Sequence, residues 1–251
     1  MKNHVFVQAR QNSQRFPNKI LKKICEKPIA ELIIERIRKI QNVDEIFLIT
    51  GPKERNDEVI REFKRNGIEY FSGSEENILD RFYQASKVLG TRNIIRITGD
   101  NPLLDFNIIN NGFKKFSDSQ YDILSNNRKK TFPIGLNFEI FTSDALKRSW
   151  EIVSKTFDDQ DIFLNTFISP TKLMLEDKRF QNFDLFYSED LSNIRLTLDY
   201  EEDFKLISKV FELLYAQKKF FLLPEILNLL KDNPRLLDIN KKHNENNLNK
   251  N

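Results

Sequence analysis

The chain has 251 residues, of which 39% are hydrophobic and 31% charged, enough for one large α/β domain or two small ones. Its 40 lysines and arginines against 37 aspartates and glutamates give a net charge of +3, which excludes a general attraction to nucleic acid or to a membrane surface. One cysteine excludes an internal disulfide and fits a reducing, cytoplasmic setting, and the N-terminal apolar run is too short for a signal peptide or a membrane span.

Strand and helix patterns alternate through the first half of the chain. This alternation predicts an α/β fold with a mostly parallel sheet covered by helices on both faces. In such sheets the loops at the carboxyl ends of the strands carry the ligands, which selects the loops after Val7, Thr50 and Thr98. The expected strands are 5–7, 46–50, 68–71, 94–98 and 121–124, and the expected helices are 29–40, 54–66, 77–89 and 108–116.

The second half of the chain is less regular. Its Asn- and Lys-rich end predicts a disordered tail over residues 240–251, after a single domain over residues 1–239. The region of about 128–192 is expected to form a small antiparallel subregion for acceptor binding or dimer contact. The expected strands are 136–141, 173–175 and 183–187, the last two as a candidate antiparallel pair, and 194–198; the expected helices are 143–153, 201–215 and one that begins at Pro224.

A basic loop follows the first strand. Residues 8–19 hold Arg10, Arg15 and Lys19 without an acidic residue to neutralise them. Arginines grip phosphate oxygens in pairs, a lysine supplies a point charge, and backbone N–H groups add donors. The residues therefore leave two interpretations open, a phosphate-binding loop and a solvated basic surface loop.

Two aspartates come directly after predicted strands. Asp100 follows Gly99 and precedes a proline-bearing turn, and Asp199 opens a helix whose first turn is acidic. Both carboxylates are suitable ligands for Mg²⁺, which uses one or two carboxylates together with substrate phosphates. The alternative for Asp100 is a turn or cap aspartate, and the alternative for Asp199 is a helix start, with Asp203 in a structural role.

Several ordered motifs resemble the cytidylyltransferases that make CMP-activated sugar acids. The closest likeness is to the SpsF-like polysaccharide-biosynthesis branch, which is related to CMP-Kdo and CMP-sialate synthetases. The likeness spans residues 5–239 and implies a Rossmann-like nucleotidyltransferase fold. It rests on Gln8-Ala9-Arg10, Ser13, Arg15 and Pro17-x-Lys19, on Gly73-Ser74-Glu75, on Gly99-Asp100-x-Pro102, on Ser125-Asn126, on Pro133-x-Gly135-Leu136-Asn137-x-Glu139, and on Leu198-Asp199, where Tyr200-Glu201 replaces the family's Thr-Pro.

The resemblance also implies roles for individual residues. Arg10, Lys19 and Asp100 are expected to be catalytic, and Asp100 and Asp199 to hold the metal. Acceptor binding is expected from Ser125, Asn126, Gly135, Asn137 and Glu139. Nucleotide binding is expected from Gln8, Ala9, Arg10, Ser13, Arg15, Lys19, Ser72, Gly73, Ser74, Arg81, Thr98 and Gly99, although Ser74 ahead of Asn77 is equally consistent with a helix cap.

One departure from the family pattern concerns the acceptor. The family's Glu-His-Val-Thr segment corresponds here to residues 158–165, which contain no histidine. The two histidines of the chain, His4 and His243, lie in unsuitable places to replace it. The acceptor pocket is therefore expected to be altered, and no specific sugar is implied.

The resemblance implies a Mg²⁺-dependent enzyme that transfers CMP from CTP to a sugar-like acceptor and releases pyrophosphate in polysaccharide biosynthesis. It also implies a homodimer. Two alternatives stay open: a nucleotidyltransferase with another base or a non-sugar acceptor, and a catalytically silent binding protein of the same pathway. A dinucleotide-binding Rossmann protein is disfavoured because no Gly-x-Gly-x-x-Gly follows the first strand.

Overall fold

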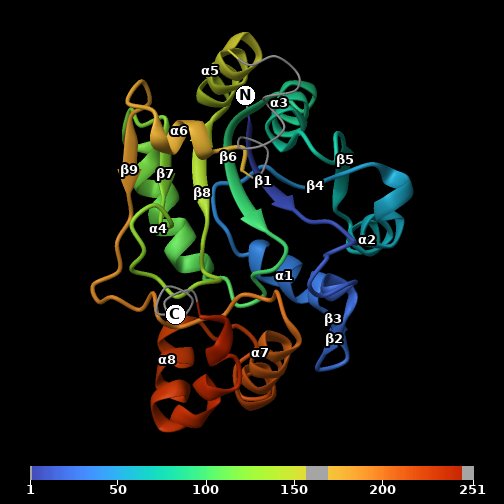
Figure 1. The fold of residues 1–251 in the computed structure, drawn as a ribbon, viewed down its shortest axis with the longest axis vertical. Helices are drawn as coiled ribbons and strands as arrows, with labels where there is room; N and C mark the ends of the chain where they lie inside the picture. Colours follow the sequence, from blue (N-terminus) through green and yellow to red (C-terminus); the bar gives the residue numbers. More distant parts are fainter. Residues whose placement is uncertain (1, 157–168, 245–251) are drawn as a thin grey trace.

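A central seven-stranded sheet organises the computed structural model, which describes residues 2–156 and 169–244 (Figure 1). The strand order is β5-β4-β1-β6-β8-β7-β9, in which β8 runs antiparallel to both of its neighbours and the other pairs are parallel. This arrangement confirms the predicted mostly parallel α/β fold with a small antiparallel part. The strands are β1 (Lys2–Gln8), β4 (Glu45–Thr50), β5 (Glu69–Ser72), β6 (Thr91–Thr98), β7 (Ile123–Ser125), β8 (Glu139–Thr142) and β9 (Asn182–Asp184).

Helices cover both faces of the sheet because the strand residues alternate between two apolar cores. Val5 and Val7 of β1 point into one core and Phe6 into the other, and all three are fully buried. The first core contains side chains of α1 (Ile29–Ile37), α2 (Lys53–Arg65), α4 (Phe106–Ser117), α7 (Glu201–Leu214) and α8 (Leu223–Asp232). The second contains side chains of α3 (Ile78–Val88), α5 (Ser143–Thr156) and α6 (Lys172–Glu176).

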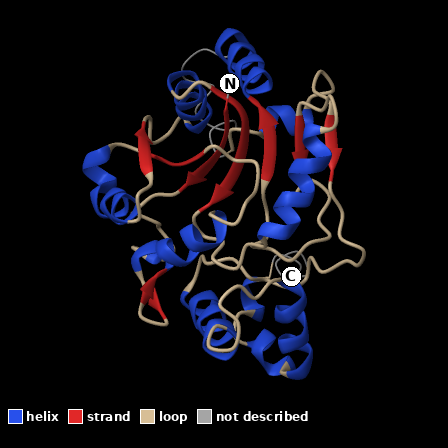
Figure 2. Ribbon diagram, turned by 180° about the vertical axis from the view of Figure 1, so that it is seen from behind, coloured by secondary structure: helices blue, strands red, loops and turns tan. Residues whose placement is uncertain are grey.

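The carboxyl ends of the parallel strands meet at one edge of the sheet. The arrowheads of β1 and β6 point toward α7, and α7 and α8 lie beyond that edge (Figures 1 and 2). The loops that follow β1 and β6 therefore come close to the segment that leads into α7. This placement sets up the site described below.

Three predictions for the second half of the chain are wrong. Residues 173–175 lie in helix α6, because their apolar side chains pack on α5 rather than on a neighbouring strand. The segment expected as a strand at 183–187 does contribute β9 (Asn182–Asp184), but β9 pairs in parallel with β7 and does not form the expected antiparallel pair with 173–175. The segment 194–198 is extended and its Leu196 and Leu198 are fully buried, but it makes a single bridge from Arg195 to Ile134 and forms no strand.

The chain end does not begin a tail at Asn240. Asn240 is buried, and its amide donates to the carbonyl of Arg195 and to the carboxylate of Asp203. Farther along, the His243 ring stacks on the ring of Tyr200 at a centroid distance of 3.8 Å. Side-chain contacts therefore hold residues 240–244 in place. The low apolar content that predicted disorder carries no information about such contacts. Short 3₁₀ turns complete this end at η3 (Pro234–Asp238) and η4 (Lys241–His243).

A short hairpin also lies between the first loop and the first helix. It consists of β2 (Lys23–Ile24) and β3 (Lys27–Pro28), preceded by the 3₁₀ turn η1 (Lys19–Leu21). Two-residue strands leave almost no alternation in the sequence, so the pattern did not predict them. In residues 2–156 and 169–244, no helix is long and apolar enough to cross a membrane.

Candidate active site

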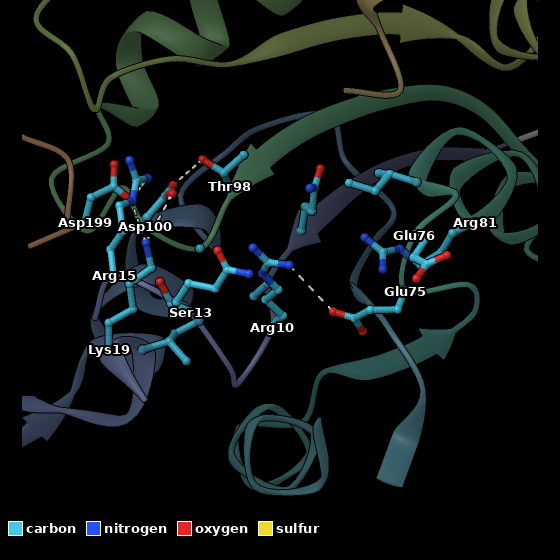
Figure 3. A pocket seen from close by; sticks show the side chains of 16 residues that line it. Arg10, Ser13, Arg15, Lys19, Glu75, Glu76, Arg81, Thr98, Asp100 and Asp199 are labelled. Atoms are coloured by element: carbon cyan, nitrogen blue, oxygen red, sulfur yellow. Dashed lines mark hydrogen bonds and ion pairs between the residues drawn. The ribbon is translucent and has the colours of Figure 1, made fainter. Parts of the chain in front are cut away.

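A cleft of about 790 Å³ opens at the carboxyl ends of β1 and β6 (Figure 3). Arg15, Lys19, Asp100 and Asp199 gather at one end of this cleft, and Glu75 and Arg81 lie at the other. Charged side chains of both signs therefore lie at both ends of the cleft, with a few apolar residues among them. Its lining consists of Gln8, Ala9, Arg10, Ser13, Gln14, Arg15, Lys19, Ile20, Glu75, Glu76, Ile78, Arg81, Thr98, Gly99, Asp100 and Asp199.

The basic loop after β1 is held by contacts at its base. The side-chain oxygen of Asn56, a buried residue of α2, accepts a hydrogen bond of 2.9 Å from the backbone N–H of Gln11. Asn18 takes a left-handed conformation with φ of 54°, which asparagine tolerates, and starts η1. The turn buries Ile20 in the core and directs Lys19 into the cleft. The loop cations are thus presented from a fixed backbone.

The loop after β6 approaches the first loop closely, and Gly99 permits this approach. A Cβ atom at Gly99 would lie 2.7 Å from the Cβ of Ala9 and 2.9 Å from the Cδ1 of Ile20. The next residue, Asp100, is docked through its carbonyl oxygen, which accepts hydrogen bonds from Leu198 N–H at 2.8 Å and from the Thr197 hydroxyl at 3.2 Å. These backbone contacts bring the two distant aspartates into one place.

Lys19 joins the two carboxylates. Its Nζ atom lies 2.9 Å from Asp199 Oδ1 and 3.4 Å from Asp100 Oδ2, and it donates to the Leu198 carbonyl at 2.6 Å. The other oxygen of Asp100 accepts a hydrogen bond of 2.5 Å from the Thr98 hydroxyl. A cation therefore already sits among three oxygen atoms between the two aspartates.

Asp199 is surrounded by cations. Arg15 Nη2 lies 2.9 Å from Oδ1 and Arg195 Nη2 lies 3.2 Å from Oδ2. Burial alone would raise the pKa of Asp199, but the charges of Lys19 and the two arginines hold it below the ordinary value of 3.8. The carboxylate is therefore ionised throughout the neutral range and available as an oxygen ligand.

We expect Asp199→Asn to lower the free energy of unfolding by about 1–2 kcal/mol near neutral pH, because its three cationic neighbours would lose their shared carboxylate. The folded-state pKa is depressed, so this contribution is complete above the unfolded value of 3.8 and is lost as the pH falls through the folded value. Urea unfolding of both proteins across the acid range measures the difference. A difference that failed to narrow below pH 3.8 would contradict this account of the ion pairs.

Asp203 has a structural role, as predicted. It is fully buried, and its Oδ2 accepts hydrogen bonds from the backbone N–H groups of Asp199 and Tyr200. Arg195 grips it in bidentate fashion, with Nε at 2.9 Å from Oδ1 and Nη2 at 3.0 Å from Oδ2. Asp203 therefore fixes the start of α7 and, through it, the position of Asp199.

The opposite end of the cleft pairs Arg10 with Glu75 at 3.7 Å, and the Arg10 side chain is 59% exposed. Behind this pair lies the buried Arg81, whose Nη1 donates to the Ser74 carbonyl at 3.0 Å. Burial lowers the pKa of Arg81 to about 10, against the opposing charge of Glu75, so the group stays cationic near neutral pH. Sequence reasoning predicted Arg10 and Arg81 at this site but not the acids that neutralise them.

Three predicted nucleotide-binding residues make structural contacts instead of lining the cleft. The Ser72 hydroxyl donates to the Gly51 carbonyl, and the Gly73 N–H donates to the Thr50 carbonyl. The Ser74 hydroxyl accepts from the N–H of Asn77, which is the helix-cap alternative. The loop borders the cleft through its next two residues, Glu75 and Glu76. Their position just before Asn77, the N-cap of α3, was the available signal.

The five predicted acceptor-binding residues lie outside the cleft. Asn126 is buried and bridges the backbone of Leu136 and Phe138. Gly135 has φ of 106°, and a Cβ there would lie 2.4 Å from the Leu196 carbonyl carbon. The backbone conformation and the close packing therefore require glycine at this position. Ser125 is buried, and its hydroxyl accepts from the N–H of Asn127. Glu139 is buried in an ion pair with Arg96, and Asn126 and Asn137 line a separate pocket of about 140 Å³.

Neither histidine of the chain lines the cleft. His4 is fully buried in β1 against the Thr91 hydroxyl, and His243 stacks on Tyr200 behind the site. The segment 158–165, which replaces the family's histidine-bearing motif, lies outside the described residues.

The oxygen atoms that surround the Lys19 ammonium are of the kind that bind a magnesium-type ion. Two carboxylates and a carbonyl supply hard oxygen atoms, and such ions take one or two carboxylates and complete their shell with water and phosphate. Within the described part of the chain, no group of three or more His, Cys, Asp or Glu residues could hold a metal. A bound ion would therefore need further ligands from a substrate, as these ions usually do.

Comparison with known proteins shows what the chain as a whole is similar to. A sequence model of the cytidylyltransferase family matches residues 4–225. An uncharacterised protein of Methanocaldococcus jannaschii is 32% identical over 242 residues, which cover 93% of this chain and 92% of that protein. The spore coat polysaccharide biosynthesis protein SpsF of Bacillus subtilis is 29% identical over 146 residues, 56% of this chain and 59% of that protein. The structure of a cytidylyltransferase from Leptospira borgpetersenii superposes with a TM-score of 0.85 at 25% identity, covering 94% of this chain and 97% of that one.

Proposed function

Because this chain belongs to the cytidylyltransferase family, we propose that it transfers CMP from CTP to a sugar or sugar-acid acceptor and releases pyrophosphate in polysaccharide biosynthesis. One observation carries this proposal. Lys19, Asp100 and Asp199 come from three distant parts of the sequence and meet within hydrogen-bonding distance in a cleft lined by further cations. That arrangement suits a polyphosphate with a divalent cation.

Different residues of the cleft have different roles toward a bound CTP. Arg10, Arg15 and Lys19, with the loop N–H groups, bind the triphosphate and offset its charge. Asp100 and Asp199 would hold Mg²⁺, which when bound supplies Lewis-acid stabilisation of charge on the α-phosphate. The acceptor oxygen forms a bond to the α-phosphorus as the bond to the pyrophosphate oxygen breaks. Alignment of the two oxygens and neutralisation of charge then supply most of the rate enhancement.

The ion pairs within the cleft support these roles. Each loop cation is paired with a cleft acid, Arg10 with Glu75 and both Arg15 and Lys19 with Asp199. A bound triphosphate would offer these cations stronger partners, and the carboxylates that they leave would then be free to hold a divalent ion that arrives with the nucleotide. The homodimer expected from the resemblance remains a prediction for this chain.

Pyrophosphate release measured with CTP, UTP, ATP and GTP, each against a panel of sugars and keto-sugar acids, tests the function. We expect kcat/KM with CTP to exceed that with each other nucleotide at least about tenfold, which corresponds to about 1.4 kcal/mol, the net contribution of one hydrogen bond to the base. Preference for another nucleotide would replace CTP in the proposal. Binding of CTP without release for any acceptor would instead favour a catalytically silent member of the family.

A further inference from the structure

A buried ion pair lies beside the cleft and was not expected from the sequence. Arg96 of β6 and Glu139 of β8 are direct cross-strand partners, both are buried, and the guanidinium Nη1 contacts Glu139 Oε2. Glu139 was expected to contact an acceptor, but its carboxylate is turned to this arginine. Removing both charges from water costs free energy. The stability of the fold therefore does not by itself explain why the pair is buried.

The remaining donor face of Arg96 holds Gln8. Arg96 Nε donates a hydrogen bond of 2.9 Å to Gln8 Oε1. A guanidinium has donors and no acceptor, so the atom of the Gln8 amide that faces it must be the oxygen. The Gln8 amide therefore has one orientation, fixed by Arg96, which is itself fixed by Glu139.

The fixed orientation of the Gln8 amide determines which of its atoms face the cleft. Gln8 ends β1 and lines the cleft, and its Nε2 atom has no hydrogen-bond partner among the described residues. With the oxygen occupied, the amide can present only N–H donors to a ligand. The neighbouring wall is mixed: the buried Nε of Arg81 and the buried Oε2 of Glu75 both lack a partner in the described part of the chain.

We propose that Arg96, braced by Glu139, is a positioning residue that locks the side-chain amide of Gln8 so that it donates to an oxygen atom of the bound nucleotide. This inference rests on the proposed function only in taking CTP as the ligand. It assigns the buried pair a role in recognition, in place of the acceptor contact expected for Glu139.

Gln8→Glu is the direct test, because it keeps the length and the contact with Arg96 but replaces the N–H donors by a carboxylate oxygen. We expect the Kd for CTP, measured by calorimetry without acceptor, to rise about tenfold to a hundredfold, the loss of a hydrogen bond to a charged ligand. An unchanged Kd overturns the proposal. Calorimetry with CMP and with pyrophosphate then places the oxygen: a loss for CMP assigns it to the nucleoside monophosphate, and a loss for pyrophosphate alone assigns it to the outer phosphates.

Arg96→Lys tests positioning through a double-mutant cycle. A lysine can still pair with Glu139, but a single ammonium does not also fix the amide plane. We expect the Kd for CTP to rise about threefold to tenfold in the wild-type background and to change less than about twofold in a Gln8→Ala background. Equal effects in both backgrounds would mean that Arg96 acts on the fold and not through Gln8, which refutes the proposal.

Two controls keep the outcomes separate. Thermal melting of each variant shows whether the buried pair still folds, and Gln8→Glu leaves that pair intact, so one variant remains informative in any case. If the wild-type protein bound no nucleoside triphosphate, the proposed function would fail. If it bound CTP and Gln8→Glu bound it equally well, this inference alone would fail.

Discussion

Asp100→Asn is expected to slow pyrophosphate release from CTP about a thousandfold, equivalent to about 4 kcal/mol of lost transition-state stabilisation. The substitution keeps the shape of the side chain and an oxygen that can accept from Thr98. The backbone contacts of Asp100 with Thr197 and Leu198 do not involve the side chain and should persist. The variant therefore removes one negative charge from the place where the divalent cation is expected, together with the 3.4 Å contact of Asp100 Oδ2 with Lys19.

The experiment compares rate with binding. Steady-state pyrophosphate release gives kcat, and calorimetry in the presence of a chelator gives the affinity for CTP without metal. We expect this affinity to stay within about threefold of wild type or to improve, because a carboxylate that repels the triphosphate is lost. Asp118→Asn, an exposed aspartate at the end of α4 outside the cleft, is the matched control and should behave as wild type. Release by Asp100→Asn at a rate near that of wild type would remove Asp100 from the mechanism.

The sheet and the edge at which the cleft lies were predictable because they depend on local patterns. Apolar runs marked β1, β4 and β6, and the rule that ligands lie at carboxyl strand ends selected the loops after β1 and β6. Lys19 and Asp100 lie in those two loops and do meet. Their meeting with Asp199 followed from the family resemblance, since 99 or more residues separate it from both and no local pattern joins them.

The partners of buried charges were not predictable. The alternation of Ile95-Arg96-Ile97 assigns Arg96 to one face of β6 but does not say what neutralises it. Its partner Glu139 is on a strand whose antiparallel register decides the pairing. The same limit hid Glu75 as the partner of Arg10, because loop residues follow no period.

Polar anchoring explains the error at the chain end. Composition predicts order from apolar content, whereas Asn240 is held by the Arg195 carbonyl and the Asp203 carboxylate. The same buried Asp203 positions Asp199. Asn240, the first residue of the segment that was expected to be a tail, therefore contributes to the support of the proposed metal site.

Lys19→Met is expected to shift two affinities in opposite directions. Kinetically, kcat/KM for CTP should fall about a hundredfold, the upper range for losing a charged hydrogen bond to phosphate. Without nucleotide, however, the affinity for Mn²⁺ should rise about tenfold, because the ammonium that now lies 2.9 Å from Asp199 and 3.4 Å from Asp100 competes for the same carboxylates. Methionine keeps the length and the packing of the side chain, so the charge is the variable.

Paramagnetic resonance of free Mn²⁺ measures the second effect independently of catalysis, and Lys23→Met, on the exposed hairpin strand β2, is the matched control for both measurements. Weaker Mn²⁺ binding in Lys19→Met would mean that the carboxylates do not form the cation site. Unchanged kcat/KM would mean that Lys19 does not reach the phosphates. If both results hold, Lys19 would couple the uptake of metal to that of nucleotide: a bound triphosphate would compete for the ammonium, and Asp100 and Asp199 would then be available to hold a divalent ion.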